Sequence, residues 1–273
     1  YGAKRENQKV KSCQKKLDYI ALKADFPDLI YCSITAFGQT GPKSHRLGYD
    51  FVIQAMGGIM SVTGEPDGSP MKVGVGIADV MCGMYAAVGI LAAIHSRDNG
   101  GRGQYIDLSL LDSQAAWLIN SGLNYLISRQ DQNRLGNAHP NIVPYEAFPT
   151  ADGYLILAVG NDSQFKSFCA VAGLDALPLD ERYATNRKRV ANRADLVPLI
   201  RQAMVAKTTD EWIDALEKAN VPCGPINTLD RVFDNPQVKH RGLVKHLDYL
   251  VLVFRVLTEN QKLSDFVVHQ FRK

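Results

Sequence analysis

The sequence predicts an α/β fold in its first half, followed by a smaller α+β unit. A short apolar run at 29–34, rich in β-forming residues, predicts a strand, and a second strand is expected over 104–108, after the turn at 98–103. Apolar segments with helical spacing follow each strand, beginning near Asp50, Asp79 and Ser109. Strands that alternate with helices in this way are typical of an α/β layer.

Polar residues at the helix starts support this assignment. The first helix is expected over 50–61 and the next over 79–96. A carboxylate at Asp79 would suit the unpaired N–H groups and the dipole at the beginning of a helix, so we expect Asp79 to cap it. Ser109, with an acidic residue three positions later, resembles a capping box and predicts a helix through about residue 128.

The second unit has a different pattern of predicted elements, with one clear strand and two helices rich in charged residues. The strand is expected over 154–159, and the helices over 193–206 and 209–219. Thr208 and Glu211 form a capping box for the second helix.

These elements suggest a three-part division of the chain. We expect part of a large domain at 1–136, a small domain at 137–235, and a return segment or divergent tail at 236–273. The tail contains a run of strong strand propensity at 249–257, to which we assign no function.

Composition excludes several classes of protein. The chain has 273 residues, of which 46% are hydrophobic and 22% charged, as in an ordinary globular protein of about two domains. A formal net charge of +3 does not call for a nucleic-acid partner. The five cysteines form no CxxC pair, so we expect no disulfide framework, no bound metal and a cytoplasmic location, with the mitochondrial matrix as the alternative.

One stretch has the length of a membrane span. Residues 73–94 contain a single charge, Asp79, and a carboxylate within a span costs about 2.5–3.5 kcal/mol. The uninterrupted apolar part, 80–94, is shorter than the roughly 20 residues that a bilayer requires. We therefore expect a buried helix and no membrane partner.

The glycines before this helix have two possible meanings. Gly74-Val75-Gly76 begins like a dinucleotide fingerprint, but Asp79 replaces the third glycine, and its charge would repel a pyrophosphate. In the other reading, a glycine-walled site lets a substrate approach the backbone, and Asp79 attacks an acyl carbon as a nucleophile. The local sequence alone favours a third interpretation, in which Asp79 is a helix cap with no chemistry.

Six segments in a fixed order favour the interpretation of Asp79 as a nucleophile. Together they resemble the class III CoA-transferases of the CaiB/BaiF family, over about 29–244. The segments are 30–42 (IYCSITAFGQTGP), 47–50 (LGYD), 76–79 (GIAD), 100–108 (GGRGQYIDL), 141–145 (NIVPY) and 221–227 (VPCGPIN).

The resemblance implies a Rossmann-like large domain, incomplete here, a small domain, and two subunits interlocked as a homodimer. It implies transfer of CoA from an acyl-CoA donor, possibly succinyl-CoA, to a small carboxylic acid, with CoA as substrate and no permanently bound cofactor. Asp79 falls at the position of the catalytic aspartate, which forms an acyl anhydride and then an aspartyl-CoA thioester. The family's initial segment is unmatched here, and residues after 244 diverge.

The resemblance also implies where CoA binds. The family's CoA-contacting segment matches Leu47, Gly48, Tyr49 and Asp50, and Asn7 matches a second CoA-contacting position. The first 23 residues carry seven basic and two acidic side chains, which could attract the CoA phosphates or form a solvated surface.

Two alternatives remain open. An α-methylacyl-CoA racemase shares this fold and moves an α-proton with an aspartate and an earlier histidine, for which His45 is the one candidate. A family member that lacks part of its large domain could also be inactive.

Overall fold

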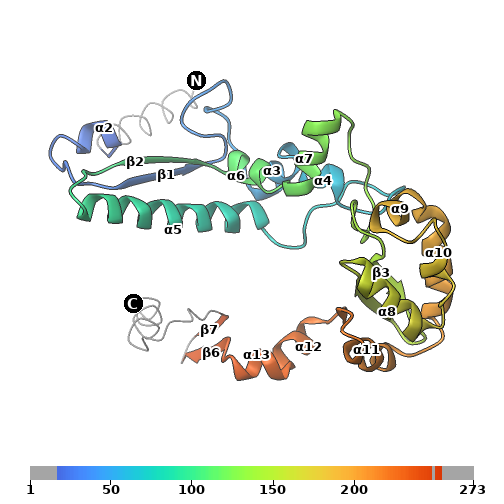
Figure 1. Cartoon of the computed structure of the whole chain (residues 1–273). Helices are drawn as coiled ribbons and strands as arrows, with labels where there is room; N and C mark the ends of the chain where they lie inside the picture. Colours follow the sequence, from blue (N-terminus) through green and yellow to red (C-terminus); the bar gives the residue numbers. More distant parts are fainter. Residues whose placement is uncertain (1–16, 248–249, 254–273) are drawn as a thin grey trace, which may run out of the picture. The chain divides into compact units, whose positions relative to one another are not determined.

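The computed structural model describes residues 17–247 and 250–253, and the chain forms two compact units, 1–140 and 141–273 (Figure 1). The first contains the predicted α/β layer and the second a small antiparallel sheet with helices. The expected division at 1–136, 137–235 and 236–273 stays a prediction.

The first unit is built on two parallel strands. Strands β1 (Tyr31–Thr35) and β2 (Tyr105–Ser109) pair in register, Tyr31 opposite Tyr105. Both predicted strands are confirmed, each within one or two residues. A short helix, α2 (Tyr19–Leu22), precedes β1, and the Tyr19 ring stacks on Tyr105 with their centroids 5.2 Å apart.

The connection between the strands carries the longest helix. Helices α3 (Asp50–Met56) and α4 (Ile59–Val62) come first, and α5 (Ile77–Asp98) then runs beside both strands (Figure 1). The prediction of a single helix over 50–61 is wrong, because the helix is interrupted at Gly57–Gly58. A Cβ atom at Gly57 would overlap the Gln114 side chain, and Gly58 has φ +88°.

A second predicted helix is also divided. Ser109 caps α6 (Leu110–Ala116) by accepting from the Asp112 N–H at 3.2 Å, as expected. The expected continuation through residue 128 is wrong, because α7 (Ile119–Ser128) starts separately with Ile119 at φ +43°. Neither glycine nor proline marks this break in the sequence, so local composition gave no signal for it.

Where α3, α5 and α6 meet the end of β1, side chains form the core of the first unit. Its buried members are Ala36, Phe37, Ile53, Ala78, Cys82 and Leu110.

The expected burial of α5 is met on one side only. Its buried residues are small, namely Ala78, Cys82, Ala86 and Ala93. The opposite side exposes larger apolar side chains between 41% and 65%: Val80, Met84, Tyr85, Val88 and Leu91. By length and composition α5 could cross a membrane, although 22% of its most apolar window is buried within the protein.

The second unit has a three-stranded antiparallel sheet and the larger core. Strand β4 (Tyr154–Ala158) lies between β3 (Tyr145–Pro149) and β5 (Cys223–Pro225). The helices are α8 (Asp162–Ala172), the 3-10 helix η1 (Leu177–Leu179), α9 (Asn186–Ala191), α10 (Arg193–Met204) and α11 (Thr209–Lys218). The capping box at Thr208 and Glu211 is confirmed.

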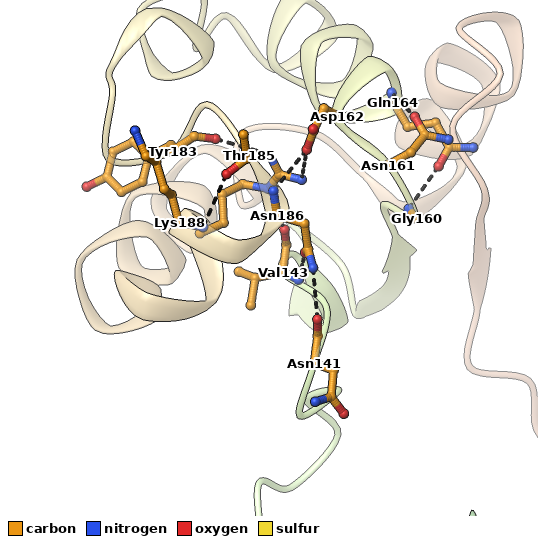
Figure 2. Close-up of polar contacts among 11 residues, drawn as sticks. Asn141, Val143, Gly160, Asn161, Asp162, Gln164, Tyr183, Thr185, Asn186 and Lys188 are labelled. Atoms are coloured by element: carbon orange, nitrogen blue, oxygen red, sulfur yellow. Dashed lines mark hydrogen bonds and ion pairs between the residues drawn. The ribbon is translucent and has the colours of Figure 1, made fainter. Parts of the chain in front are cut away.

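Polar contacts fix the segment that leads into β3 (Figure 2). The Asn186 amide donates to the Asn141 carbonyl at 2.9 Å and accepts from the Val143 N–H at 3.1 Å. Arg189, which is fully buried, donates to the Val143 carbonyl at 2.7 Å and to Asp162 at 2.8 Å. Because the guanidinium is paired, its charge is tolerated inside the core.

Two short helices and a hairpin follow β5. They are α12 (Leu229–Asp234), α13 (Pro236–His240) and the antiparallel strands β6 (Val244–Leu247) and β7 (Leu250–Val253). Strand β7 falls within the predicted strand-forming run 249–257, whose other residues lie outside the described ones.

Glu146 gives the second unit a specific pH dependence. Its side chain is buried on β3 beside Arg201, at 2.9 Å, and burial raises the pKa of the carboxyl group despite that guanidinium. A raised pKa means that the folded protein binds this proton more tightly than the unfolded chain does. The stability that the protonated Glu146 contributes is therefore lost as pH rises from the ordinary carboxyl pKa of about 4.5 through the folded-state pKa. Relative to Glu146→Gln, the natural chain should therefore lose stability over this interval.

Urea unfolding at several pH values, followed by tryptophan fluorescence, measures that difference. Glu181→Gln is the matched control, because a hydrogen bond from Lys188 lowers the pKa of exposed Glu181 and its effect has the opposite sign. Equal pH dependence in the natural chain and in Glu146→Gln would contradict the prediction.

Candidate active site

Asp79 lies in the first turn of α5, with its side chain exposed to solvent. The helix starts after Gly76, so Asp79 is its third residue and does not cap it, contrary to expectation. The residue before it, Ala78, is buried in the core of the first unit. This arrangement anchors the backbone at Asp79 while leaving the carboxylate accessible.

A different carboxylate occupies the N-terminus of α5. Asp50, the first residue of α3, accepts through Oδ1 from the N–H of Ala78 at 2.8 Å and of Asp79 at 3.4 Å. The two aspartates are 29 positions apart in the sequence, and the fold brings them together. A negative charge at this end of a helix is favourable, since the unpaired N–H groups carry partial positive charge.

A second buried residue supports this junction. The Gln54 side chain donates to Asp50 Oδ2 at 2.7 Å and to the Val75 carbonyl at 3.2 Å, and it accepts from the Val73 N–H at 2.9 Å. Gln54 is fully buried. Sequence reasoning missed it, although a polar residue one turn after Asp50 at a position of apolar periodicity was an available signal.

The other predicted CoA-contacting residues lie in the segment that enters α3. Leu47 and Tyr49 are 91% and 82% exposed. Gly48, between them, lies so close to the core that an added Cβ would be 2.8 Å from the Ala36 Cβ. The structure therefore gathers Leu47, Gly48, Tyr49 and Asp50 in one strip, whereas Asn7 lies outside the described residues.

Cys82 lies one turn beyond Asp79 and does not compete with it as a nucleophile. Its side chain is buried, as expected, and burial raises the pKa of the thiol, with the carboxylates of Asp79 and Asp112 adding to the shift. It therefore stays a neutral thiol at neutral pH. Within residues 17–247 and 250–253, no cluster of His, Cys, Asp or Glu could hold a metal ion.

Comparison with known proteins assigns the family. The model of CoA-transferase family III matches residues 5–267. The chain belongs to CoA-transferase family III. The match begins earlier and ends later than the expected 29–244, so it includes residues in which the sequence had suggested divergence.

Several relatives of this chain carry names that state an activity. Succinate–glutarate CoA-transferase of Agrobacterium fabrum is 52% identical over 83% of this chain and 57% of its own length. Succinyl-CoA:glutarate CoA-transferase of Mus musculus is 44% identical over 82% of this chain and 51% of its own. This chain therefore spans about half the length of these relatives.

Solved family III structures have the same fold. A CaiB/BaiF family protein from Brucella suis superposes with a TM-score of 0.76 and 45% identity, covering 92% of this chain and 67% of that one. The predicted CaiB/BaiF fold is confirmed.

The close approach at Gly48 yields a stability prediction. Gly48→Ala should lower the free energy of unfolding by about 1–3 kcal/mol, because its Cβ displaces buried Ala36 and Phe37. Gly83→Ala is the matched control. It lies within α5 with open space around it, so alanine should raise stability by about 0.5–1 kcal/mol. Urea unfolding of both variants checks this, and an unchanged Gly48→Ala protein would contradict it.

Proposed function

We propose that this chain carries the nucleophile of an acyl-CoA:carboxylate CoA-transferase, and that Asp79 is that nucleophile. The observation that carries the proposal is the exposed Asp79 on an anchored first turn of α5, in a chain of family III. The names of the relatives, all CoA-transferases among those compared above, support the reaction class.

The reaction proceeds through two kinds of covalent intermediate. An ionised oxygen of Asp79 attacks the thioester carbonyl carbon, and the C–S bond breaks with its electron pair on sulfur. This gives a mixed anhydride and CoA thiolate. The thiolate then attacks the aspartyl carbonyl carbon, which releases the donor acid as a carboxylate and leaves an aspartyl-CoA thioester.

The acceptor acid completes the cycle by the reverse steps. Its carboxylate attacks the aspartyl-CoA thioester, and the released thiolate attacks the acceptor carbonyl carbon of the new anhydride, freeing Asp79 and forming the new acyl-CoA. Every nucleophile and every leaving group is an anion, so no proton has to move. Acyl groups stay activated throughout provided that water is kept out.

Backbone N–H groups beside Asp79 could stabilise the tetrahedral intermediates. Those of Ala78 and Asp79 are engaged by Asp50. Those of Gly74 and Gly76 have no acceptor among the described residues, and both glycines are exposed. Without side chains at these two positions a thioester oxygen can reach the N–H groups, which supports their role as oxyanion donors.

The segment entering α3 supplies a surface for CoA. Leu47 and Tyr49 are exposed apolar side chains beside the Asp50–α5 junction, and we assign them, with Gly48, Asp50 and Asn7, to CoA contacts. CoA is a substrate here and no cofactor is permanently bound.

For the substrates, we propose succinyl-CoA as donor and a small dicarboxylate as acceptor. The names of the relatives support this choice, since they pair succinate or succinyl-CoA with glutarate or, in Haloarcula marismortui, with mesaconate.

For assembly and location, we propose an interlocked homodimer in the cytoplasm, with the mitochondrial matrix as the alternative. The exposed apolar side of α5 supports a partner subunit, because large apolar patches are normally covered. The four cysteines within the described residues are all free, which supports a reducing compartment.

Trapping tests the role of Asp79. Incubating the complete protein with acyl-CoA and hydroxylamine should convert Asp79 to a hydroxamate, detectable by peptide mass spectrometry. Asp79→Asn should lower CoA transfer by more than about 1000-fold, because the nucleophile is lost. Asp67→Asn, in the exposed turn before α5, is the control and should keep full activity. Undiminished transfer by Asp79→Asn would refute the proposal.

A substrate screen tests the proposed acceptor. With succinyl-CoA as the single donor, dicarboxylates such as glutarate should be converted faster than monocarboxylates of equal length.

Product analysis separates CoA transfer from racemisation. Deuterium from solvent appearing at the α-carbon of an acyl-CoA, with no acceptor acid present, would favour the racemase reaction.

A further inference from the structure

From the contacts of Gln54 we infer that this buried amide is a positioning residue for Asp79, acting through Asp50 and the 73–75 backbone. The inference rests on the proposed role of Asp79 as nucleophile. Gln54 is the fifth residue of α3 and fully buried, yet three hydrogen bonds use both of its amide hydrogens and its oxygen.

The first of these bonds orients Asp50. The Gln54 amide donates to Oδ2 at 2.7 Å, so the other oxygen, Oδ1, is turned toward the N-terminus of α5. Asp50 and Gln54 are one helical turn apart on α3, where side chains face each other. An Asp50 carboxylate released from Gln54 could rotate about its side-chain torsions and leave the Ala78 and Asp79 N–H groups.

The other two bonds fix the chain that leads to Asp79. Gln54 accepts from the Val73 N–H and donates to the Val75 carbonyl, at 2.9 and 3.2 Å, on either side of Gly74. Glycine backbone is the least restrained, so an unbraced loop here would sample many conformations. Held by Gln54, the loop keeps Gly74 and Gly76 at a constant place relative to Asp79.

One side chain thus sets both halves of the site, the nucleophile-bearing turn and the glycine loop. Replacement of Gln54 should slow the covalent step more than it weakens CoA binding, because Gln54 hydrogen-bonds to Asp50 among the proposed CoA-contacting residues but not to the exposed Leu47 and Tyr49. Misplacement by about 1 Å can cost about 100-fold in rate.

The test compares Gln54→Met with Gln114→Met in the complete protein. Gln114 is a buried glutamine of the same unit whose Oε1 has no partner among the described residues, so it matches Gln54 in burial and volume but not in role. With succinyl-CoA as donor and glutarate as acceptor, Gln54→Met should lower kcat about 10- to 100-fold, with KM for succinyl-CoA changed less than about threefold. Gln114→Met should match the natural chain within about twofold.

A double-variant cycle distinguishes positioning from general destabilisation. If Gln54 acts through Asp50, the loss in kcat for Asp50→Asn combined with Gln54→Met should be smaller than the product of the two single losses. A combined loss equal to that product, or kcat in Gln54→Met equal to that of the natural chain, would overturn the inference. If Gln54→Met does not fold, Gln54→Asn takes its place. Asparagine keeps the amide but is one methylene shorter, so the amide no longer reaches Asp50 and the 73–75 backbone, and the same outcomes apply.

Hydroxylamine trapping in the natural chain keeps this result separate from the proposed function. Absence of any Asp79 hydroxamate in the natural chain would reject the function itself. A hydroxamate that forms equally fast in the natural chain and in Gln54→Met would reject only the role of Gln54.

Discussion

The bond between the Asp50 carboxylate and the first turn of α5 is the contact on which the candidate site depends. It satisfies N–H groups that the helix cannot pair itself, and it joins α3 to α5 across a glycine-rich segment that contains α4. It also frees Asp79 from the capping role that its position suggested. A carboxylate engaged as a cap would be a poor nucleophile, because its lone pairs would already accept hydrogen bonds.

The residue composition of α5 also helps to hold Asp79 in position. Small residues on its buried side, such as Ala86 and Ala93, let the helix lie close to the sheet, and a Cβ added at Gly89 would lie 3.6 Å from the Ile106 side chain. Close packing of this kind limits how far the helix can shift, and so how far Asp79 can move. The opposite side of the helix carries large apolar side chains that nothing in the described first unit covers.

The two units differ in how they gain rigidity. The second has an extensive apolar core and a buried Arg189 that donates three hydrogen bonds, whereas the first has a small core of six buried residues that includes Ala78, next to Asp79. In the first unit, polar contacts of Asp50 and Gln54 therefore carry much of the positioning. Buried polar networks of this type specify one arrangement when every member is satisfied.

Local spacing was enough to predict the strands at β1, β2 and β4 and the caps at Ser109 and Thr208, and the ordered motifs led to Asp79 as the proposed nucleophile. Those features depend on residues within one or two turns of each other, or on an ordered set of motifs. The break before Ile119, the exposed side of α5 and the capping of α5 by Asp50 could not be predicted in this way, whereas the glycine pair Gly57–Gly58 was a local signal for the break after α3. The cap joins residues 28 and 29 positions apart in the chain, and such contacts are decided only when helices and sheet pack together.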